Sequence, residues 1–137
     1  MGSFVSKMVT RESLVCIIHH IYDTLGPGYN ECVYQSAFEV MLRKHGIVYD
    51  TQPIRPIMFE GYSIGSIRMD LIVEGDYIIE LKAVSKLLES ASIQTKNYMK
   101  LSGISKAILV NFPQVSDKVL PDILHYGDDV SKKVIDM

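Results

Sequence analysis

The stretch MDLIVEGDYIIELKAV, residues 69–84, contains two apolar segments separated by a polar turn at residues 74–76. Short apolar segments on either side of such a turn predict a β-hairpin. Asp70 lies near the start of the first strand, and Glu80 and Lys82 lie within the second. Because burial of an unpaired carboxylate costs free energy, the stretch predicts that these residues either pair with each other or bind a metal ion.

Side-chain alternation along the second strand places Glu80 and Lys82 on one face and Leu81 on the other. The turn brings Asp70 back toward Glu80, so two carboxylates converge beside one lysine, with the Leu81 carbonyl between them as a candidate third oxygen ligand. Such ligands suit Mg²⁺, which lowers the pKa of a bound water and neutralises charge on a phosphate. In the alternative interpretation, Glu80 and Lys82 are a charge pair on a solvated strand face and Asp70 begins a strand.

Helical spacing of apolar residues predicts helices on both sides of this hairpin. The first follows Thr10, a candidate N-cap, and ends before the Gly-Pro-Gly at 26–28. The second follows this breaker and ends at Gly46, a good helix stop. The third lies within residues 86–103.

The remaining segments predict strands and one further helix. Residues 53–61 contain two prolines and predict at best an edge strand, whereas residues 106–112 predict a short buried strand. Residues 117–127 predict a helix interrupted by Pro121. A helix between the last two strands indicates a crossover connection, and hence a mixed sheet flanked by helices.

Length and composition narrow the class of protein. The chain has 137 residues and a net charge of −2, which suits one compact domain and argues against a general nucleic-acid coat. An enzyme that contacts a few phosphates around an acidic metal site is not excluded.

Cys16 and Cys32 lack metal-ligand spacing, so we expect buried free thiols in a reducing compartment. We find no signal segment and no apolar run of about 18 residues. We therefore expect an intracellular protein of the cytoplasm or nucleus that does not span a membrane.

Two further motifs carry polar residues at regular spacing. Gly28, Glu31 and Tyr34 form G-x-x-E-x-x-Y, and Gln94 and Tyr98 are four residues apart on one helical face. Taken alone, Glu31 could be a solvated first-turn residue favoured by the helix dipole. Gln94 could likewise be a helix surface residue, and Tyr98 a core aromatic.

The ordered set G-x-x-E-x-x-Y, Asp, E-x-K and Q-x-x-x-Y resembles the PD-(D/E)XK nuclease superfamily, in its exonuclease-type, RecB-like branch. More closely, residues 25–47, the hairpin and residues 98–112 are similar to the GxxExxY proteins. This resemblance covers about residues 10–112. It implies an α/β fold with a restriction-endonuclease-like core. The core would be a central mixed β-sheet flanked by helices, in the order α-α-β-β-β-α-β. Residues 1–137 would form a single domain with 113–137 as a C-terminal extension.

The resemblance also implies roles for the hairpin residues and for Glu31. Asp70 and Glu80 would hold Mg²⁺ or Mn²⁺ together with the Leu81 carbonyl. Lys82 would position or activate the attacking water, and Glu31 would bind the metal directly or through a water. The reaction would be hydrolysis of a phosphodiester bond by metal-activated water.

The third helix would carry the remaining functional residues. Gln94 would orient the metal site or a nearby phosphate, and Tyr98 would pack or contact a phosphate. Lys96 and Lys100 share a helical face at i, i+4, and we expect them to contact the nucleic-acid backbone, although solvated lysines are the ordinary alternative. The sequence departs from the superfamily name at Met69, which stands where the name has proline.

Three functions are consistent with these residues. The first is a metal-dependent nuclease acting on nucleic acid, with DNA as the expected substrate. The second is a catalytically inactive nuclease-fold module that binds nucleic acid or a protein partner, and the third is a metal-dependent phosphoesterase of small nucleotides. Because a domain of this size has little surface for sequence readout, we expect it to form a homodimer or join a larger complex.

Overall fold

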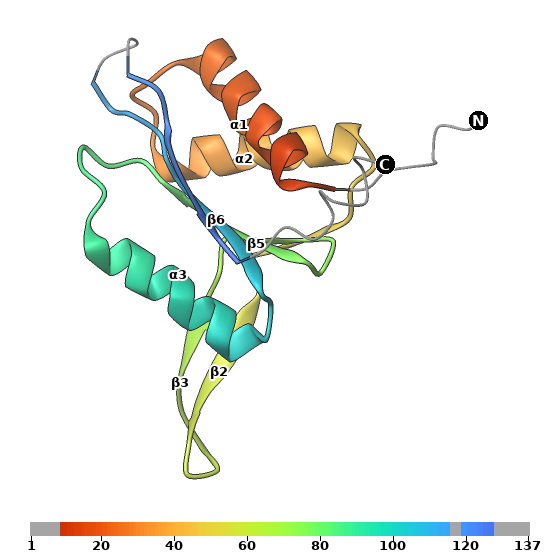
Figure 1. The fold of residues 1–137 in the computed structure, drawn as a ribbon, viewed down its shortest axis with the longest axis vertical. Helices are drawn as coiled ribbons and strands as arrows, with labels where there is room; N and C mark the ends of the chain where they lie inside the picture. The colour runs from red at the N-terminus through yellow and green to blue at the C-terminus, as the bar shows by residue number, and fades with distance from the viewer. Residues whose placement is uncertain (1–8, 116–118, 128–137) are drawn as a thin grey trace.

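The computed structural model describes residues 9–115 and 119–127. Within these residues it contains three helices and seven strands (Figure 1). The helices are α1 (Arg11–Leu25), α2 (Glu31–Lys44) and α3 (Glu89–Ser102). The strands are β1 (Tyr49–Thr51), β2 (Ile54–Phe59), β3 (Tyr62–Arg68), β4 (Leu71–Val73), β5 (Tyr77–Lys82), β6 (Lys106–Asn111) and β7 (Asp122–Tyr126).

Five strands form a mixed sheet in the order β1-β4-β5-β6-β7. Only β5 and β6 run parallel, and α3 is the crossover between them. Helices α1 and α2 cover one face of the sheet and α3 covers the other (Figure 1). The prediction of a mixed α/β fold with a central sheet flanked by helices is therefore confirmed.

The two faces of the sheet differ in how much apolar side chain they bury. The face under α1 and α2 belongs to a cluster of seventeen buried residues, whereas the cluster under α3 has five. Alternation along β5 divides its side chains accordingly, with Ile79 and Leu81 in the large cluster and Ile78 in the small one. Glu80 and Lys82 therefore lie on the α3 side, where the apolar core is smaller.

Local sequence signals explain the helix boundaries. The Thr10 side chain accepts a hydrogen bond from the Ser13 backbone N–H, and the Ser13 side chain accepts one from the Thr10 N–H, which forms a capping box. Helix α3 ends at Gly103 in the left-handed conformation. The three predicted helices are confirmed, and no helix in the described part of the chain is long and apolar enough to cross a membrane.

Three expectations are wrong. Residues 122–126 form the edge strand β7 instead of a helix, because their pairing supplies hydrogen-bond partners to the backbone of the buried strand β6 and overrides the local helical pattern. The region before α3 contains five strands instead of three, because β1 and β4 extend the pairing of β2 and β3 into the main sheet. Cys16 and Cys32 are free thiols, but both are exposed, since each lies on the solvent side of its helix.

Candidate active site

The candidate site begins where a long antiparallel pairing bends. Thr51 pairs with Leu71 and Ile54 pairs with Arg68, so the register is the same on both sides of the bend. Two backbone hydrogen bonds bridge it, from the Gln52 N–H to the Asp70 carbonyl (2.8 Å) and from the Met69 N–H to the Pro53 carbonyl (3.0 Å). The backbone dihedral φ of Gln52 is +53°, which is uncommon for a residue other than glycine.

The bend changes the face to which side chains point. Met69 and Ile72 both belong to the cluster under α3, although strict alternation would place them on opposite faces. The break lies at Met69 and Asp70, which belong to no strand. This break allows the Asp70 carboxylate to turn toward the end of β5. Irregularities in strands near active sites often redirect a side chain in this way.

Asp70 and Glu80 hold each other in place through backbone groups. The Asp70 N–H donates to Glu80 Oε2 and the Leu81 N–H donates to Asp70 Oδ2, both at 2.8 Å. Each of these bonds occupies one carboxyl oxygen. The structure therefore brings the two predicted carboxylates together and leaves the second oxygen of each available to a ligand.

The Leu81 carbonyl also faces this site. The Phe112 N–H donates to the Lys82 carbonyl at 2.9 Å, so the backbone groups of Lys82 point toward β6. Groups of successive strand residues point to opposite sides, and the Leu81 N–H does point to Asp70. The Leu81 carbonyl accordingly lies on the Asp70 side, beyond the point where β4 pairs with β5.

Lys82 is held by α3. Its Nζ donates to Gln94 Oε1 at 3.1 Å, and Gln94 also hydrogen-bonds to Tyr98. Burial, together with the negative charges of Glu80 and Asp70, raises the pKa of Tyr98 to about 12, against the lowering effect of the Gln94 bond. The Tyr98 hydroxyl therefore stays protonated at neutral pH and supplies a hydrogen-bond donor beside the carboxylates.

Glu31 reaches the same site from the start of α2, where Asn30 caps the helix. Burial raises its pKa, and the charge of Asp70 raises it further, while Lys82 lowers it. Burial is also the main cause of the raised pKa of Asp70, which the Leu81 N–H and Lys82 oppose. These mutual effects mean that Glu31, Asp70 and Lys82 lie within electrostatic range of one another.

Glu80 is the most strongly perturbed carboxyl group. It is 2% exposed, and burial, followed by the charge of Asp70, raises its pKa to about 8. The hydrogen bond from the Asp70 N–H and the charge of Lys82 only partly offset this. Such perturbation is frequent at functional sites.

Lys96 and Lys100, the lysines of α3 predicted to bind substrate, lie away from the carboxyl groups at the end of β5. Lys96 Nζ is 5.8 Å from the centre of the Tyr126 ring, and Ser92 on the same helix hydrogen-bonds to the Tyr126 hydroxyl at 2.6 Å. This side of α3 faces β7, whereas Gln94 faces Lys82. Lys100 is exposed near the end of the helix.

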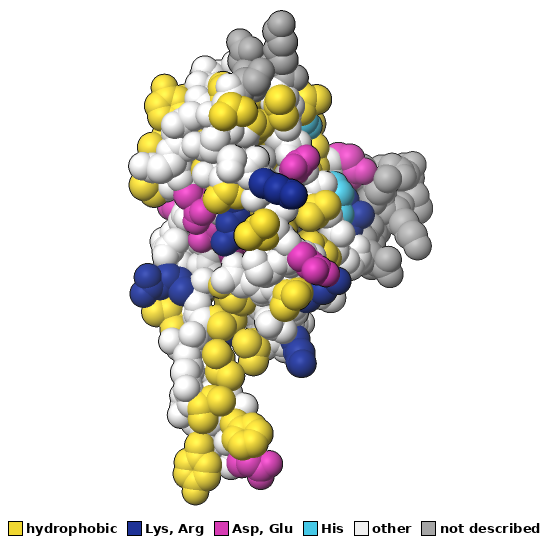
Figure 2. Space-filling view, turned by 90° about the vertical axis from the view of Figure 1, so that its left-hand side faces the viewer, with side chains coloured by type: hydrophobic (Ala, Val, Ile, Leu, Met, Phe, Trp, Pro, Cys, Tyr) yellow, Lys and Arg dark blue, Asp and Glu magenta, His cyan; other side chains and the backbone are white. Residues whose placement is uncertain are grey.

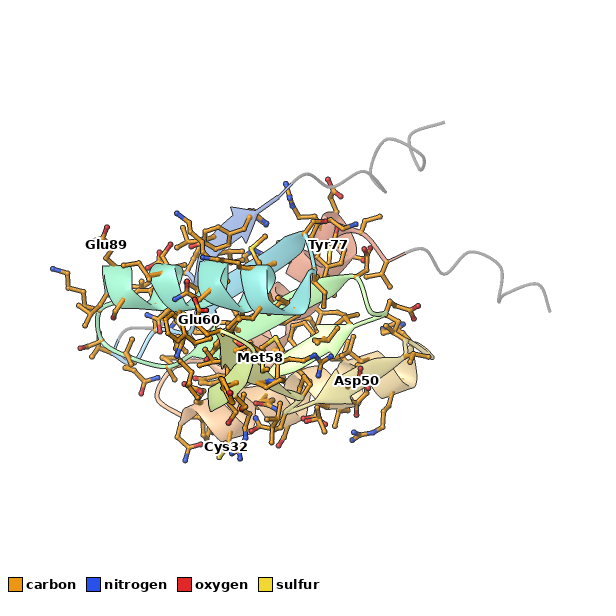
Figure 3. All side chains as sticks on the ribbon, turned by 90° about the horizontal axis from the view of Figure 1, so that it is seen from below. Cys32, Asp50, Met58, Glu60, Tyr77 and Glu89 are labelled. Carbon is orange, nitrogen blue, oxygen red and sulfur yellow. The ribbon has the colours of Figure 1, made fainter. Side chains whose placement is uncertain are left out.

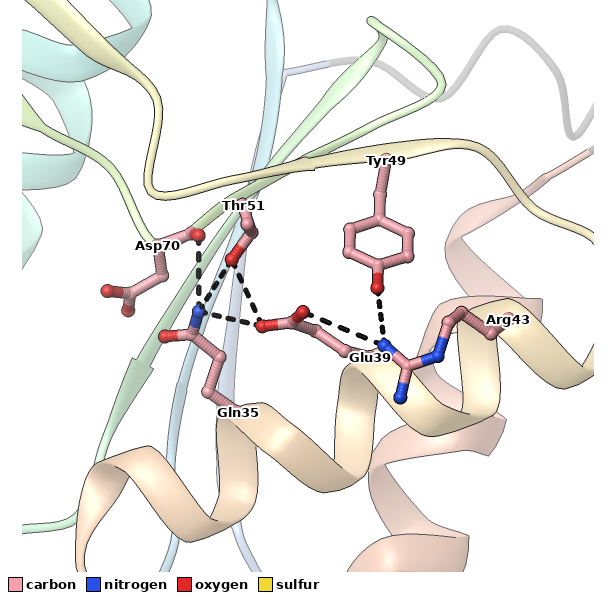
Figure 4. A network of polar contacts seen from close by, with 6 residues as sticks. All are labelled: Gln35, Glu39, Arg43, Tyr49, Thr51 and Asp70. Carbon is pink, nitrogen blue, oxygen red and sulfur yellow. Dashed lines mark hydrogen bonds and ion pairs between the residues drawn. The ribbon is translucent and has the colours of Figure 1, made fainter.

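Gln35 is a polar residue that the sequence interpretation did not single out. It is 9% exposed, and its Nε2 donates to Glu39 Oε2 (3.1 Å), Thr51 Oγ1 (3.3 Å) and the Asp70 carbonyl (3.5 Å), while its Oε1 accepts from Gln52 (3.2 Å). Figure 4 shows how the contacts with Thr51 and the Asp70 carbonyl tie α2 to the bend that presents Asp70. Its position one helical turn after Glu31 is the only sequence signal for this role.

The donor set fits a hard divalent cation. Magnesium sites in proteins usually contain one or two carboxylates, with water and substrate phosphate as the other ligands, and Asp70 and Glu80 match that pattern. In the described ranges, no three His, Cys, Asp or Glu side chains form a cluster that could hold a metal on their own. The fit therefore rests on two carboxylates and a backbone carbonyl.

Comparison with known families agrees with this geometry. The family model of the PD-(D/E)XK nuclease superfamily matches residues 8–120. The match covers most of the chain, and the protein belongs to this superfamily. A search of curated proteins found no match.

Solved structures are similar to this chain at low sequence identity. The crystal structure of SSO0001 is similar with a TM-score of 0.52 and 19% identity, over 75% of this chain and 52% of that one. The chain thus spans about half the length of that protein. An alkaline exonuclease from Laribacter hongkongensis gives a TM-score of 0.44 and 13% identity, over 98% of this chain and 77% of that one. A phage-related exonuclease from Haemophilus somnus 129PT gives 0.42 and 14%, over 93% and 76%.

Proposed function

We propose that this protein is a metal-dependent nuclease that hydrolyses phosphodiester bonds of nucleic acid, with DNA as the expected substrate. The observation that carries the proposal is the convergence of Asp70, Glu80 and Lys82 at the end of β5 in a member of a nuclease superfamily. The neighbouring exonucleases are too distant to indicate the substrate. The narrower assignment to the RecB-like branch and the GxxExxY proteins rests on the sequence motifs alone.

Asp70, Glu80 and the Leu81 carbonyl would hold Mg²⁺ or Mn²⁺. Since these residues form no three-carboxylate cluster with Glu31, Glu31 would act through a water. Such an ion, when bound, neutralises phosphate charge and lowers the pKa of water. It would also offset the burial that raises the pKa values of all three carboxyl groups, and the charge of Asp70 that raises those of Glu31 and Glu80 further.

Lys82 would orient and help to deprotonate the attacking water. Gln94 accepts a hydrogen bond from Lys82 Nζ and so fixes the direction of the ammonium group. Tyr98, whose hydroxyl stays protonated, would donate to a phosphate oxygen. Attack by water at phosphorus breaks one P–O ester bond, which leaves a phosphate on one product and a hydroxyl on the other.

We further propose that the nuclease acts inside the cell, as a homodimer or in a larger complex. A net charge of −2 gives little general attraction for nucleic acid, so a partner would add binding surface. Neither the partner nor the location affects the chemistry assigned to Asp70, Glu80 and Lys82.

The first experiment is cleavage of end-labelled single- and double-stranded DNA and RNA with Mg²⁺ or Mn²⁺, beside the Asp70→Asn protein. Asparagine keeps the shape of the side chain but removes the charge. We expect wild type to cut DNA only when the metal is present, and the variant to lose this activity while its melting temperature stays close to that of wild type. If neither protein cuts any polymer, or both cut equally, the inactive binding module replaces the nuclease.

A further inference from the structure

Strands β2 and β3 form a two-stranded ribbon that projects from the rest of the molecule (Figure 1). Its turn is Glu60-Gly61, where both residues have positive φ, as a two-residue hairpin turn requires. Figure 2 shows apolar side chains along this ribbon, and Figure 3 looks onto its tip at Met58 and Glu60. The large exposed side chains are Ile54, Met58, Phe59, Tyr62 and Ile64. Exposed apolar groups gathered in this way mark a binding surface.

The ribbon is continuous with the candidate active site. The pairing of Ile54 with Arg68 continues in register through the bend at Gln52 and Asp70 into β1 and β4, and the register shifts once within the ribbon, between Ile57 and Met58. Phe59 pairs with Tyr62 at the tip, and these two rings are 63% and 74% exposed. A polymer whose reacting phosphate lies at Asp70 and which follows β3 outward therefore meets the exposed face of the ribbon.

Two cavities lie between the ribbon and Lys82. One cavity of about 580 Å³ lies between β3 and α3, with Arg68 and Asn97 in its walls. A second cavity of about 290 Å³ contains Lys82 and Lys86. Ser90 and Gln94 line both cavities, which are therefore adjacent. We call the route through both cavities the path. It has Arg68 at one end, Lys86 at the other and Lys82 between them, which matches the charge of a chain of phosphates.

We propose that single-stranded DNA occupies this path, an inference that rests on the proposed nuclease function. The phosphates on either side of the reacting one lie near Arg68 and Lys86, and an unpaired base beyond Arg68 stacks on Phe59 or Tyr62. Stacking on aromatic side chains requires accessible base faces, which single strands offer and duplexes cover. Binding of this kind is tolerant of sequence because every base has a stacking face.

The test measures DNA binding without cleavage, by fluorescence anisotropy of labelled oligonucleotides in EDTA at low salt. The variant is Phe59→Ala/Tyr62→Ala, whose side chains are exposed and contribute little to the core. The matched control is Val40→Ala/Val48→Ala, which removes apolar side chains that are 44% and 70% exposed elsewhere. Single-stranded DNA, a blunt duplex and single-stranded RNA are compared, and sedimentation gives the oligomeric state of each protein.

We expect the ribbon variant to bind single-stranded DNA about tenfold or more weakly than wild type, and the control to bind as wild type does. Wild type should bind the duplex more weakly, with no effect of the ribbon variant. Unchanged affinity of the ribbon variant for single-stranded DNA would overturn the proposal, as would a preference for RNA. A wild-type dimer that the ribbon variant converts to a monomer with unchanged DNA affinity would assign the ribbon to self-association.

Binding and cleavage separate this inference from the proposed function. Ribbon-dependent binding of single-stranded DNA without any cleavage by wild type in Mg²⁺ or Mn²⁺ would support the path and reject the nuclease. Metal-dependent cleavage with normal binding and cleavage by the ribbon variant would support the nuclease and reject the path.

Discussion

Two lysines at opposite ends of the parallel β5–β6 pair have different surroundings. Near the start of β5, Lys106 Nζ lies 2.7 Å from Asp76 Oδ2 and 4.5 Å from the centre of the Tyr77 ring. At the end of β5, Lys82 Nζ lies 3.1 Å from the neutral Gln94 Oε1. Among the described residues, no carboxylate lies within the 4.0 Å limit of an ion pair with Lys82.

The difference separates a structural charge from one that is available for chemistry. Lys106 is neutralised within the fold, so its charge requires no further ligand. Lys82 is held in direction by an uncharged group while Asp70 and Glu80 nearby repel each other. A phosphate and a cation bound together would neutralise this end of the sheet, which is the pattern expected of a site that stabilises developing charge.

Replacement of Lys82 tests this difference most strongly. We expect Lys82→Ala to lower the rate of metal-dependent cleavage about 10²–10⁴-fold, because the attacking water loses its orienting and basic group. The melting temperature should change little, since no ion pair is lost. Lys44→Ala, at an exposed position in the last turn of α2, is the control and should keep wild-type cleavage. Wild-type rates in Lys82→Ala would contradict the assignment.

The buried carboxyl of Glu80 gives a pH-dependent effect on stability. Its pKa is raised from 4.5 to about 8 in the folded protein, so between these values the folded state keeps a proton that the unfolded state has lost. The free energy of unfolding should therefore fall as pH rises through this range, by a few kcal/mol at most. Urea unfolding in EDTA at several pH values measures it for wild type and Glu80→Gln.

The Glu80→Gln variant should show a shallower decline, because it keeps the contributions of Asp70 and Glu31 but loses that of Glu80. Parallel curves for the two proteins would mean that Glu80 titrates normally. In that case the charges around Lys82 would be as well balanced as those around Lys106, and the electrostatic difference between the two lysines would be lost.

Replacement of Asp76 tests the structural role of the Lys106–Asp76 ion pair near the start of β5. Asp76→Asn leaves Lys106, whose side chain is 7% exposed, without its counter-ion. Loss of one partner of a buried pair is destabilising, and because Asp76 is half exposed we expect about 1–2 kcal/mol. Cleavage should be unchanged, and Lys106→Met in the same protein should restore much of the stability. A loss of cleavage without a loss of stability would contradict the structural role.

Much of the fold was predictable because its signals are local. The capping residue Thr10, the breaker at 26–28 and the stop at Gly103 each act within a few residues. Strand β7 was missed because the pairing partner that makes Asp122–Tyr126 extended lies in β6, far away in the sequence. The sequence pattern shows which residues prefer a helix, but it does not show an unfilled edge of a sheet.

The sequence predicted which residues form the site and roughly where in the fold they come together. Asp70, Glu80 and Lys82 could be grouped because a short turn relates the two strands, and their convergence is present in the structure. The bend at Gln52 and the support from Gln35 could not be predicted. Both depend on a contact between α2 and the hairpin that has no periodic signature.

Gln35 gives the smallest expected effect and the sharpest test of how the site is built. Gln35→Ala removes the hydrogen bonds to Thr51 and the Asp70 carbonyl that Figure 4 shows, and the hydrogen bond from Gln52. Residues that support metal ligands typically contribute about 10–100-fold to metal affinity or activity. Since Gln35 supports only the backbone of Asp70, we expect the low end, a roughly tenfold rise in the Mg²⁺ concentration that gives half-maximal cleavage.

The rate at saturating Mg²⁺ separates positioning from a general loss of structure. If Gln35 positions Asp70, high Mg²⁺ should restore most of the rate, because the catalytic groups remain and only the ligand geometry has loosened. If Gln35 merely stabilises α2 against the hairpin, the melting temperature should fall while the Mg²⁺ dependence stays as in wild type. Ser36→Ala, at the exposed neighbouring position, should change neither quantity. Lys82 would then act beside a carboxylate, Asp70, that Gln35 positions from α2 on the other face of the sheet. Lys106, in contrast, depends only on its direct partner Asp76.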